Sequence, residues 1–411
     1  MSINRETSTD LRLPQQTFDD DFILTISKVF SGVRWIGIVG ASRIKWKLYA
    51  LTLFCLFLAI EGQASKKVMR ALAGVAVDIS GHRSVAARLA GLMFYTAVLL
   101  GFIQSNRISN SWNDISVYWA SVEWSQNIPN MSRDKTLRKR MYRVTLVIIM
   151  SGSVVYFLDA LQAINFQCKL PFCLKQIILK THGFLLRESE YSDWVGILTL
   201  FMSVIANIIW IFQDLLIILF SMGLSSRYRR LNECVEVMVA ENNRNKNWSK
   251  DQDILQIYAW RKIREAYIKQ AILVRRVDNT LGGLVLVYNF FNFYFICLQL
   301  FYGIIQGISN DGTKNYFFLI DLVWVAGRTI YTILSAADVN KYSTMALPYL
   351  FNCQNNGYNI EVQRLQKQLI KNYVALTGMG FYNINRSVVL QMMGTIVTYV
   401  LVLVQYDASE G

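Results

Sequence analysis

The chain has 411 residues, of which 53% are hydrophobic, 13% aromatic and only 17% charged, and its formal net charge is +14. This composition, with a positive mean hydropathy, is not that of a soluble globular protein. It predicts an all-α membrane protein. Because the positive charge falls in loops where anionic lipid headgroups are the simpler partner, we expect no nucleic-acid partner.

Seven apolar stretches predict seven transmembrane helices, most of them long enough for a hydrocarbon core of about 30 Å. The predicted spans are Lys47–Ala64, Ala87–Ile108, Val144–Phe166, Val195–Met222, Leu284–Ile308, Tyr316–Ala337 and Val388–Tyr406. The implied segments are a cytoplasmic N-terminal segment (1–46), helices 1–4 (47–222), a cytoplasmic helical extension (223–283), helices 5–6 (284–339), a second cytoplasmic helical segment (340–387), and helix 7 with a short extracellular tail (388–411).

The basic residues predict how these helices are oriented. Most of the 42 Lys and Arg residues lie in the N-terminal segment and in the loops 107–143, 223–283 and 338–387, which share one side of the membrane. The positive-inside rule therefore predicts a cytoplasmic N-terminus and an extracellular C-terminus. This orientation argues against a G-protein-coupled receptor, and the lack of internal repeats argues against a secondary transporter.

The last predicted span carries a polar stripe along one helical face. Its residues, spaced alternately 4 and 3 apart, are Gln391, Thr395, Thr398, Val402 and Gln405, followed by Tyr406 and Asp407 at the membrane edge. Such a stripe either joins helices through hydrogen bonds or lines water. Because one helix cannot enclose water, we predict a pore built from identical subunits, with Asp407 forming an acidic ring that attracts cations.

The sequence shows no pattern typical of an enzyme. It lacks the GxSxG, Walker and HExxH motifs, and its only histidines, His82 and His182, are isolated. We therefore expect no catalytic residue, no cofactor and no metal site. Cys168 and Cys173 share a predicted external loop, where they form either a disulfide or two free thiols.

The C-terminal residues Thr398–Tyr406, TYVLVLVQY, resemble the TY-five-apolar-QF signature of insect gustatory receptors, with Tyr406 in place of Phe. The stretches VALTG (374–378), FY (381–382) and MGTIVT (393–398) extend this likeness. The chain is most similar to the sugar-receptor branch through SMGLSSRY (221–228), GRT (327–329), AADVN (336–340) and GTIVT (394–398). It departs at Val400, where sugar-branch members often carry Glu.

The resemblance implies a ligand-gated, weakly selective cation channel of four subunits, with helix 7 lining a central pore and an outward-facing tastant pocket in each subunit. Its implied location is the plasma membrane of chemosensory neurons, as a multi-pass protein. The implied partners are a sugar, permeating cations, membrane lipids, and either identical subunits or related gustatory receptors. Two alternatives stay open, a bitter- or odorant-type member of the superfamily and a metabotropic chemoreceptor that does not conduct.

Polar and aromatic residues in the outer halves of the spans are the candidates for the pocket. Carboxylates and amides hydrogen-bond to vicinal hydroxyls, and aromatic rings stack on pyranose rings. The predicted ligand-binding residues are Tyr156, Asp159, Gln162, Asn207, Trp210, Gln299, Asp321 and Trp324. Deeper in the membrane, Asp214 and Arg328 are predicted to form a structural charge pair or a hydrogen-bonded network. We expect sugar binding to draw the outer helix ends together and to open a gate near Val402 and Gln405.

Overall fold

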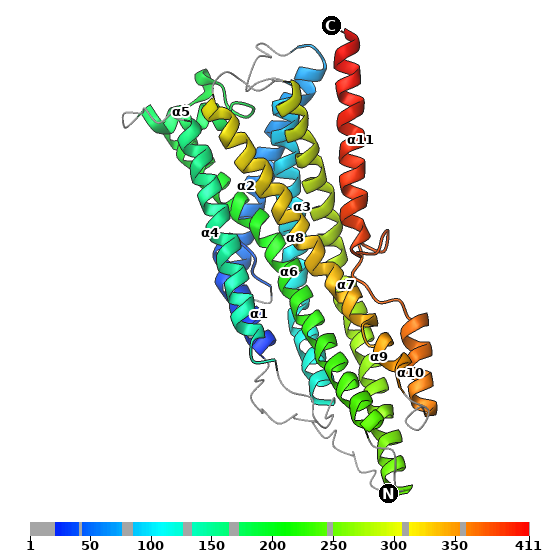
Figure 1. Cartoon of the computed structure of the whole chain (residues 1–411). Helices are drawn as coiled ribbons and strands as arrows, with labels where there is room; N and C mark the ends of the chain where they lie inside the picture. The colour runs from blue at the N-terminus through cyan, green and yellow to red at the C-terminus, as the bar shows by residue number, and fades with distance from the viewer. Residues whose placement is uncertain are drawn as a thin grey trace, which may run out of the picture.

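The computed structural model is a bundle of long helices (Figure 1). It describes residues 21–40, 43–75, 85–125, 134–163, 172–244, 250–305, 312–353 and 359–410. The α-helices are α1 (Asp21–Gly32), α2 (Ile44–Leu72), α3 (Val85–Ser125), α4 (Leu137–Ala163), α5 (Phe172–Thr181), α6 (Asp193–Arg244), α7 (Lys250–Ile305), α8 (Gly312–Thr344), α9 (Leu347–Phe351), α10 (Ile360–Lys371) and α11 (Ser387–Glu410). Two short 3-10 helices, η1 (Val33–Ile36) and η3 (Glu188–Glu190), precede α2 and α6.

Among the described residues, 6 helices are long and apolar enough to cross a membrane. These segments are Ile44–Leu72, Ala87–Glu123, Leu137–Ala163, Asp193–Arg244, Ile254–Phe301 and Tyr316–Phe351. Each of them overlaps one of the first six predicted spans, in the same order. The prediction of an all-α membrane protein is thus confirmed. The last predicted span lies in α11, whose described apolar part, Ser387–Val402, is shorter than the others. A seventh crossing, the sidedness and the tetramer stay predictions.

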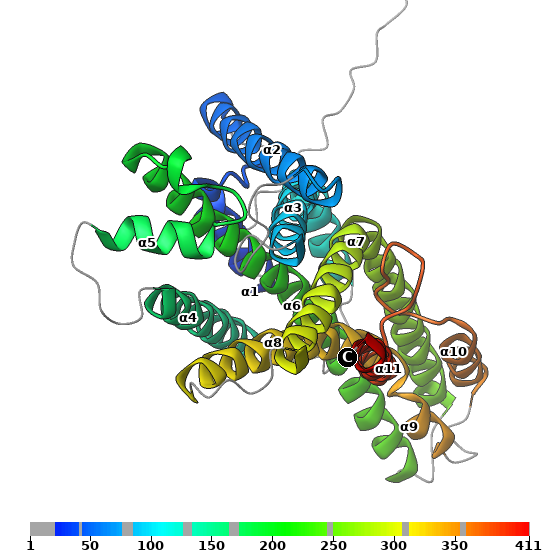
Figure 2. The ribbon, with the colours of Figure 1, turned by 90° about the horizontal axis from the view of Figure 1, so that it is seen from above.

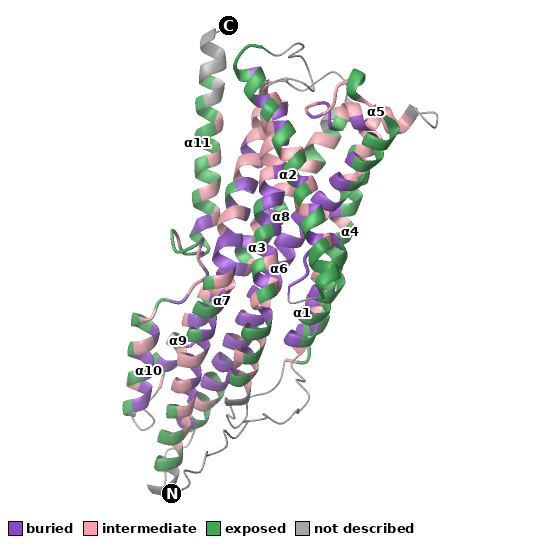
Figure 3. Cartoon of the chain, turned by 180° about the vertical axis from the view of Figure 1, so that it is seen from behind, coloured by how far each residue is buried: buried purple, intermediate pink, exposed green. Residues whose placement is uncertain are grey.

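Helix α6 lies in the middle of the bundle (Figure 2) and contacts α3, α4, α5, α7 and α8. Its middle third is buried on every side, from Ile209 to Ser221, and Figure 3 shows this buried surface continuing into its neighbours. A helix that is apolar all round needs a complete shell of packed neighbours or lipid. Any displacement of α6 is therefore transmitted to most of the bundle.

Helix α1 lies in the part of the chain that was predicted only as a cytoplasmic N-terminal segment. Its apolar side chains Phe22, Ile26 and Phe30 are buried in the main core. The Phe22 ring stacks on Trp119 of α3 at a centroid distance of 4.1 Å. Gly223 of α6 leaves room for the same phenyl ring, since a Cβ there would lie 2.4 Å from it. Helix α1 is thus part of the packed bundle.

Helices α6 and α7 continue well beyond their apolar stretches, and α9 and α10 lie against these extensions (Figure 1). The described residues of 223–283, the predicted helical extension, are helical. Asn359 is the N-cap of α10, and its side chain accepts hydrogen bonds from the backbone N–H groups of Glu361 and Val362. Glu361 then pairs with Arg264 of α7 at 2.7 Å. These contacts fix α10 to the α7 extension.

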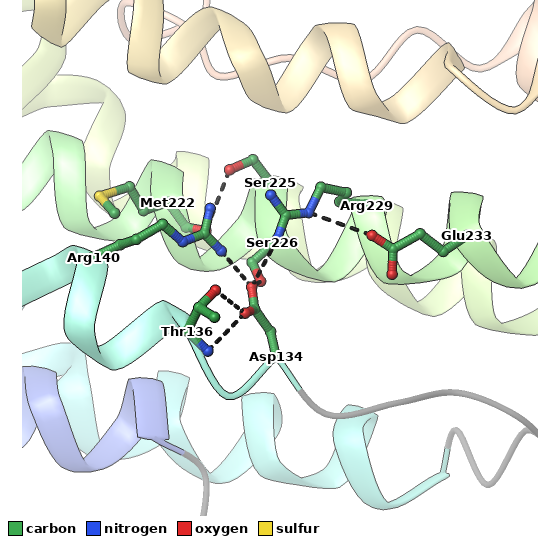
Figure 4. A network of polar contacts seen from close by, with 8 residues as sticks. All are labelled: Asp134, Thr136, Arg140, Met222, Ser225, Ser226, Arg229 and Glu233. Carbon is green, nitrogen blue, oxygen red and sulfur yellow. Dashed lines mark hydrogen bonds and ion pairs between the residues drawn. The ribbon is translucent and has the colours of Figure 1, made fainter.

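A polar network around Asp134 attaches the start of α4 to α6 (Figure 4). The Asp134 carboxylate accepts from the Ser226 hydroxyl at 2.7 Å and pairs with Arg140 at 2.5 Å and Arg229 at 3.2 Å. Burial by itself raises the pKa of this carboxyl, but hydrogen bonds from Thr136 and Ser226 and the charge of Arg140 bring it down to about 2. The ionised carboxylate therefore stabilises the fold at neutral pH.

We expect Asp134→Asn to destabilise the protein by about 1–3 kcal/mol, because an amide cannot accept as many charged hydrogen bonds. Since the folded pKa lies below the unfolded value, the contribution is present above about pH 4 and is lost as the pH falls toward 2. Thermal unfolding of the detergent-solubilised protein at several pH values measures it. The control is Asp114→Asn, which removes an exposed carboxylate of α3. Equal melting temperatures for both variants at pH 7 would contradict this role.

Candidate functional site

The predicted ligand-binding residues lie on four helices that contact one another, α4, α6, α7 and α8. Tyr156 of α4 reaches Ser203 of α6, with 3.5 Å between the two hydroxyl oxygens. Lys180 of α5 donates to the backbone carbonyl of Gln162 at 3.2 Å. Two predicted pocket residues, Tyr156 and Gln162, thus link α4 to α6 and α5.

Asp159 and Asp321 lie on α4 and α8, two helices that contact each other. Their carboxylates are close enough to interact electrostatically. Gln299 of α7 donates its side-chain amide to the Asp321 carboxylate. Two carboxylates and an amide from three helices are the groups that hydrogen-bond to adjacent hydroxyls of a polyol. This group of Asp159, Gln299 and Asp321, called here the carboxylate cluster, is the polar centre of the candidate site.

Trp210 packs in an aromatic layer between helices. Its ring stacks on Phe94 of α3 at 5.2 Å and meets Phe295 of α7 edge to face at 5.0 Å. Only 9% of Trp210 is exposed, so one of its faces is already covered. Its neighbour Asn207 is half-buried on the same helix. Of the two predicted indoles, Trp324 is therefore the more accessible.

Arg328 joins this aromatic layer to the core. It pairs with the fully buried Asp214 of α6, at 3.0 Å between Nε and Oδ2, so the predicted charge pair is confirmed. Its guanidinium also donates to Asn292 at 3.1 Å and lies 5.8 Å from the ring centres of both Trp210 and Trp324. Arg328 is not among the predicted ligand-binding residues. The spacing of Asp321, Trp324 and Arg328, i, i+3 and i+7 on α8, was the available signal.

The segment between α5 and α6 folds against the bundle. Phe184 packs over Gly91 of α3, where a Cβ would lie 2.4 Å from its ring, and burial lowers the pKa of the adjacent His182 to about 4. Lys67 of α2 holds the loop through an ion pair with Glu190 at 2.6 Å. Cys173 of α5 is disulfide-bonded, while Cys168 lies outside the described residues. These contacts hold the segment between α5 and α6 against α2 and α3.

The polar stripe of α11 faces away from its own bundle. The helix packs on α7 and α8 through Val388, Val389 and Met392. The stripe residues Gln391, Thr395, Thr398, Val402 and Gln405 are all exposed. Figures 1 and 3 show α11 at the edge of the molecule with little buried surface. The side chains of Tyr406 and Asp407 lie outside the described residues, although both belong to α11.

Two features of the stripe bear on what it contacts. The Thr395 and Thr398 hydroxyls donate to the carbonyls of Gln391 and Gly394, each at 2.9 Å, so the threonines need no further acceptor. A Cβ at Gly394 would meet nothing within 4 Å in this chain. The exposed face of α11 is therefore compatible with water and with another helix. Residues on this face are the only members of the predicted pore group whose exposure is described.

The connector between α10 and α11 is fixed to α7 and α8. Asp278 of α7 accepts from the Thr377 backbone at 2.6 Å and from its hydroxyl at 2.8 Å. Asn289 of α7 donates to the Tyr382 hydroxyl at 2.7 Å, and Asn340 of α8 donates to the Val374 carbonyl at 2.9 Å. Because α7 and α8 also carry Gln299 and Asp321, the candidate site and the base of α11 are joined by continuous helices.

Comparison with known proteins gives the same overall picture. The protein family described as Trehalose receptor matches residues 23–411. The chain is 28% identical over 328 residues to the gustatory receptor for sugar taste 64f of Drosophila melanogaster, which covers 78% of this chain and 66% of that protein. It is 26% identical over 329 residues to gustatory receptor 5a for trehalose of the same species, covering 78% and 69%. The chain thus matches about two thirds of the length of these relatives.

Gustatory receptor for sugar taste 64b of Drosophila melanogaster is 26% identical over 399 residues, covering 93% of this chain and 92% of that protein. Among solved structures, the insect olfactory receptor OR5 from Machilis hrabei in complex with eugenol superposes with a TM-score of 0.67 at 12% identity. That likeness covers 94% of this chain and 100% of the receptor chain, and at this identity it shows a shared fold.

Proposed function

This chain belongs to the trehalose receptor family, the sugar-receptor branch of the insect gustatory receptors, and from this premise we propose that it is a sugar-gated, non-selective cation channel. It is a multi-pass membrane chemoreceptor and not an enzyme. The proposed assembly has four subunits, each contributing α11 to a central pore. The proposed location is the plasma membrane of chemosensory neurons.

The observation that carries the proposal is the exposed polar stripe of α11. Polar side chains on a membrane helix require water, ions or another protein surface, and the chain's own bundle supplies none of these to the stripe. Several copies of α11 around an axis enclose a polar channel. This arrangement supports Gln391, Thr395, Thr398 and Gln405 as pore-lining residues, with Val402 as an apolar constriction. Tyr406 and Asp407 complete the proposed gate and outer ring.

We place the sugar site at the carboxylate cluster, with Tyr156, Gln162 and Asn207 at its edges and Trp210 and Trp324 as its aromatic surfaces. Charged side chains inside the membrane are rare and mark functional pathways. Hydroxyls of a sugar bridge Asp159 on α4 to Asp321 and Gln299 on α8 and α7, which favours a contracted outer bundle. Since α7 and α8 hold the connector before α11, that contraction shifts the population between closed and open gates.

The test is whole-cell recording from cells that express only this chain, exposed in turn to trehalose, sucrose, maltose, glucose, fructose, inositol and a bitter alkaloid. The expected result is a cation current evoked by at least one sugar in the absence of added G protein. Asp321→Asn should then raise the half-activating sugar concentration about tenfold, because an amide in place of the carboxylate weakens one charge-assisted hydrogen bond. Lys175→Gln, on the surface of α5, is the control.

The other outcomes separate the alternatives. A current evoked only by the alkaloid would indicate a bitter-type receptor. Surface-expressed protein that responds to sugar only through a second messenger would indicate a metabotropic receptor, and current restored by a related receptor subunit would indicate a heteromer. An unchanged sugar response in Asp321→Asn would show that the carboxylate cluster does not bind the sugar. It would not contradict the proposal that the protein is a channel.

A further inference from the structure

A basic pocket lies where α4, α6 and α8 meet the base of α11. Its volume is about 510 Å³. Four arginines line it, Arg140 and Arg143 of α4, Arg229 of α6 and Arg386 just before α11, whereas Asp338 is the one carboxylate in its wall. Residues with hydroxyl groups, among them Ser225, Ser335 and Tyr331, also line it. The pocket therefore offers an excess of cationic donors.

The carboxylates nearby do not balance these arginines. Arg140 and Arg229 share a single carboxylate, that of Asp134 behind the pocket, as Figure 4 shows. Arg229 also lies 3.6 Å from Glu233, and Arg386 pairs with Asp338 at 3.0 Å. Arg143 is exposed and has no ion pair with any residue in the described parts of the chain. An anion in the pocket would complete the coordination of these guanidinium groups.

An apolar groove continues from the pocket between α4 and α8. Its volume is about 950 Å³, and it shares Arg143, Val144 and Tyr331 with the basic pocket. Its remaining lining is mostly apolar, with Ser151, Tyr316, Trp324 and Arg328 as the polar or aromatic members and, among the aliphatic ones, Val147, Ile148, Val154, Leu319, Ile320 and Val323. Both helices are candidate membrane spans. The groove thus faces the hydrocarbon region, and the four arginines of the basic pocket lie at one end of it, where headgroups are expected.

We propose that the α4–α8 groove binds one anionic phospholipid, with its phosphate in the basic pocket and an acyl chain along the apolar groove. Guanidinium groups bind phosphate oxygens through paired hydrogen bonds, and Arg143 is the arginine best able to do so. A zwitterionic lipid carries its own ammonium and leaves the surplus of arginines unbalanced. The basic loops predict that this end is cytoplasmic, the side whose leaflet is rich in anionic lipid.

The same pocket links the lipid to the pore helix. Arg386 immediately precedes α11, and its partner Asp338 belongs to α8. A phosphate in the pocket competes with Asp338 for Arg386 and so alters the attachment of α11 to α8. This consequence rests on the proposed channel function, whereas lipid binding itself does not.

Binding is tested with the purified full chain in detergent, by titrating dioleoyl phosphatidic acid and dioleoyl phosphatidylcholine and counting retained lipid by native mass spectrometry. We expect phosphatidic acid to be retained in preference to phosphatidylcholine. Arg143→Gln should weaken its retention about tenfold, a loss of one charged contact. The matched control is Lys139→Gln, which removes an exposed charge one turn away that does not line the pocket.

A second variant separates a lipid from a free anion. A Cβ at Gly327, which lines the groove, meets nothing within 4 Å, so Gly327→Leu fills groove space without changing charge. It should reduce phosphatidic acid retention and leave any stabilisation by inorganic phosphate unchanged. Equal retention of both lipids, equal losses in Arg143→Gln and Lys139→Gln, or full retention in Gly327→Leu would each overturn the proposal. Because the readout is bound lipid, failure of the channel assignment would not affect it.

Discussion

Gln405→Leu should abolish the sugar-evoked current and leave the amount of receptor at the cell surface unchanged. Gln405 is exposed near the end of α11, one turn beyond Val402 on the polar stripe. With leucine there, the proposed gate has two successive apolar rings, and a narrow apolar pore expels water and stops conducting. Because the side chain is exposed and outside the core, the substitution has little effect on folding.

The experiment pairs whole-cell current with surface biotinylation of the same cells. Leu401→Gln is the matched control, since it changes the same two residue types on a neighbouring exposed position of α11 outside the stripe. It should conduct, whereas Gln405→Leu should not. A normal current in Gln405→Leu would remove this residue from the gate, and loss of current in both variants would indicate that α11 tolerates no change in polarity at this depth.

The membrane helices were predictable because each span must be apolar over a length fixed by the bilayer. Charge pairing was predictable for Asp214 and Arg328 for a related reason, since an unpaired charge at that depth is too costly to keep. Lateral packing is different. Nothing in hydropathy indicates that Trp210 stacks on Phe94 or that Gln299 donates to Asp321.

Helix α1 could not be found from hydropathy because it is amphipathic and, at 12 residues, too short to span a membrane. Its position depends on how Phe22 fits against Trp119 and Gly223, contacts between segments far apart in the chain. The connector before α11 was missed for a similar reason, since its order comes from side chains such as Asp278 on another helix. Hydropathy patterns predict how deep a residue lies in the membrane. They do not predict which other segments of the chain it contacts at that depth.

Arg328→Met should cause the largest loss of folded protein among single substitutions in the bundle. Asp214 is fully buried and Arg328 is 4% exposed, so the variant leaves a carboxylate inside the membrane without its cation. Breaking a buried pair in this way costs about 3–5 kcal/mol. Surface expression and the melting temperature measure the effect. Lys175→Met, which breaks the exposed pair with Glu188, should change neither.

The double variant Asp214→Leu with Arg328→Met distinguishes a structural pair from a functional one. Replacing both charges by apolar groups removes the desolvation cost together with the attraction, so folding should largely recover. Sugar sensitivity should not recover, because Arg328 also lies over Trp210 and Trp324 and so positions these two aromatic surfaces of the proposed sugar site. Full recovery of both folding and sensitivity would reduce Arg328 to a packing role and place the sugar site farther toward the outer ends of α4 and α8.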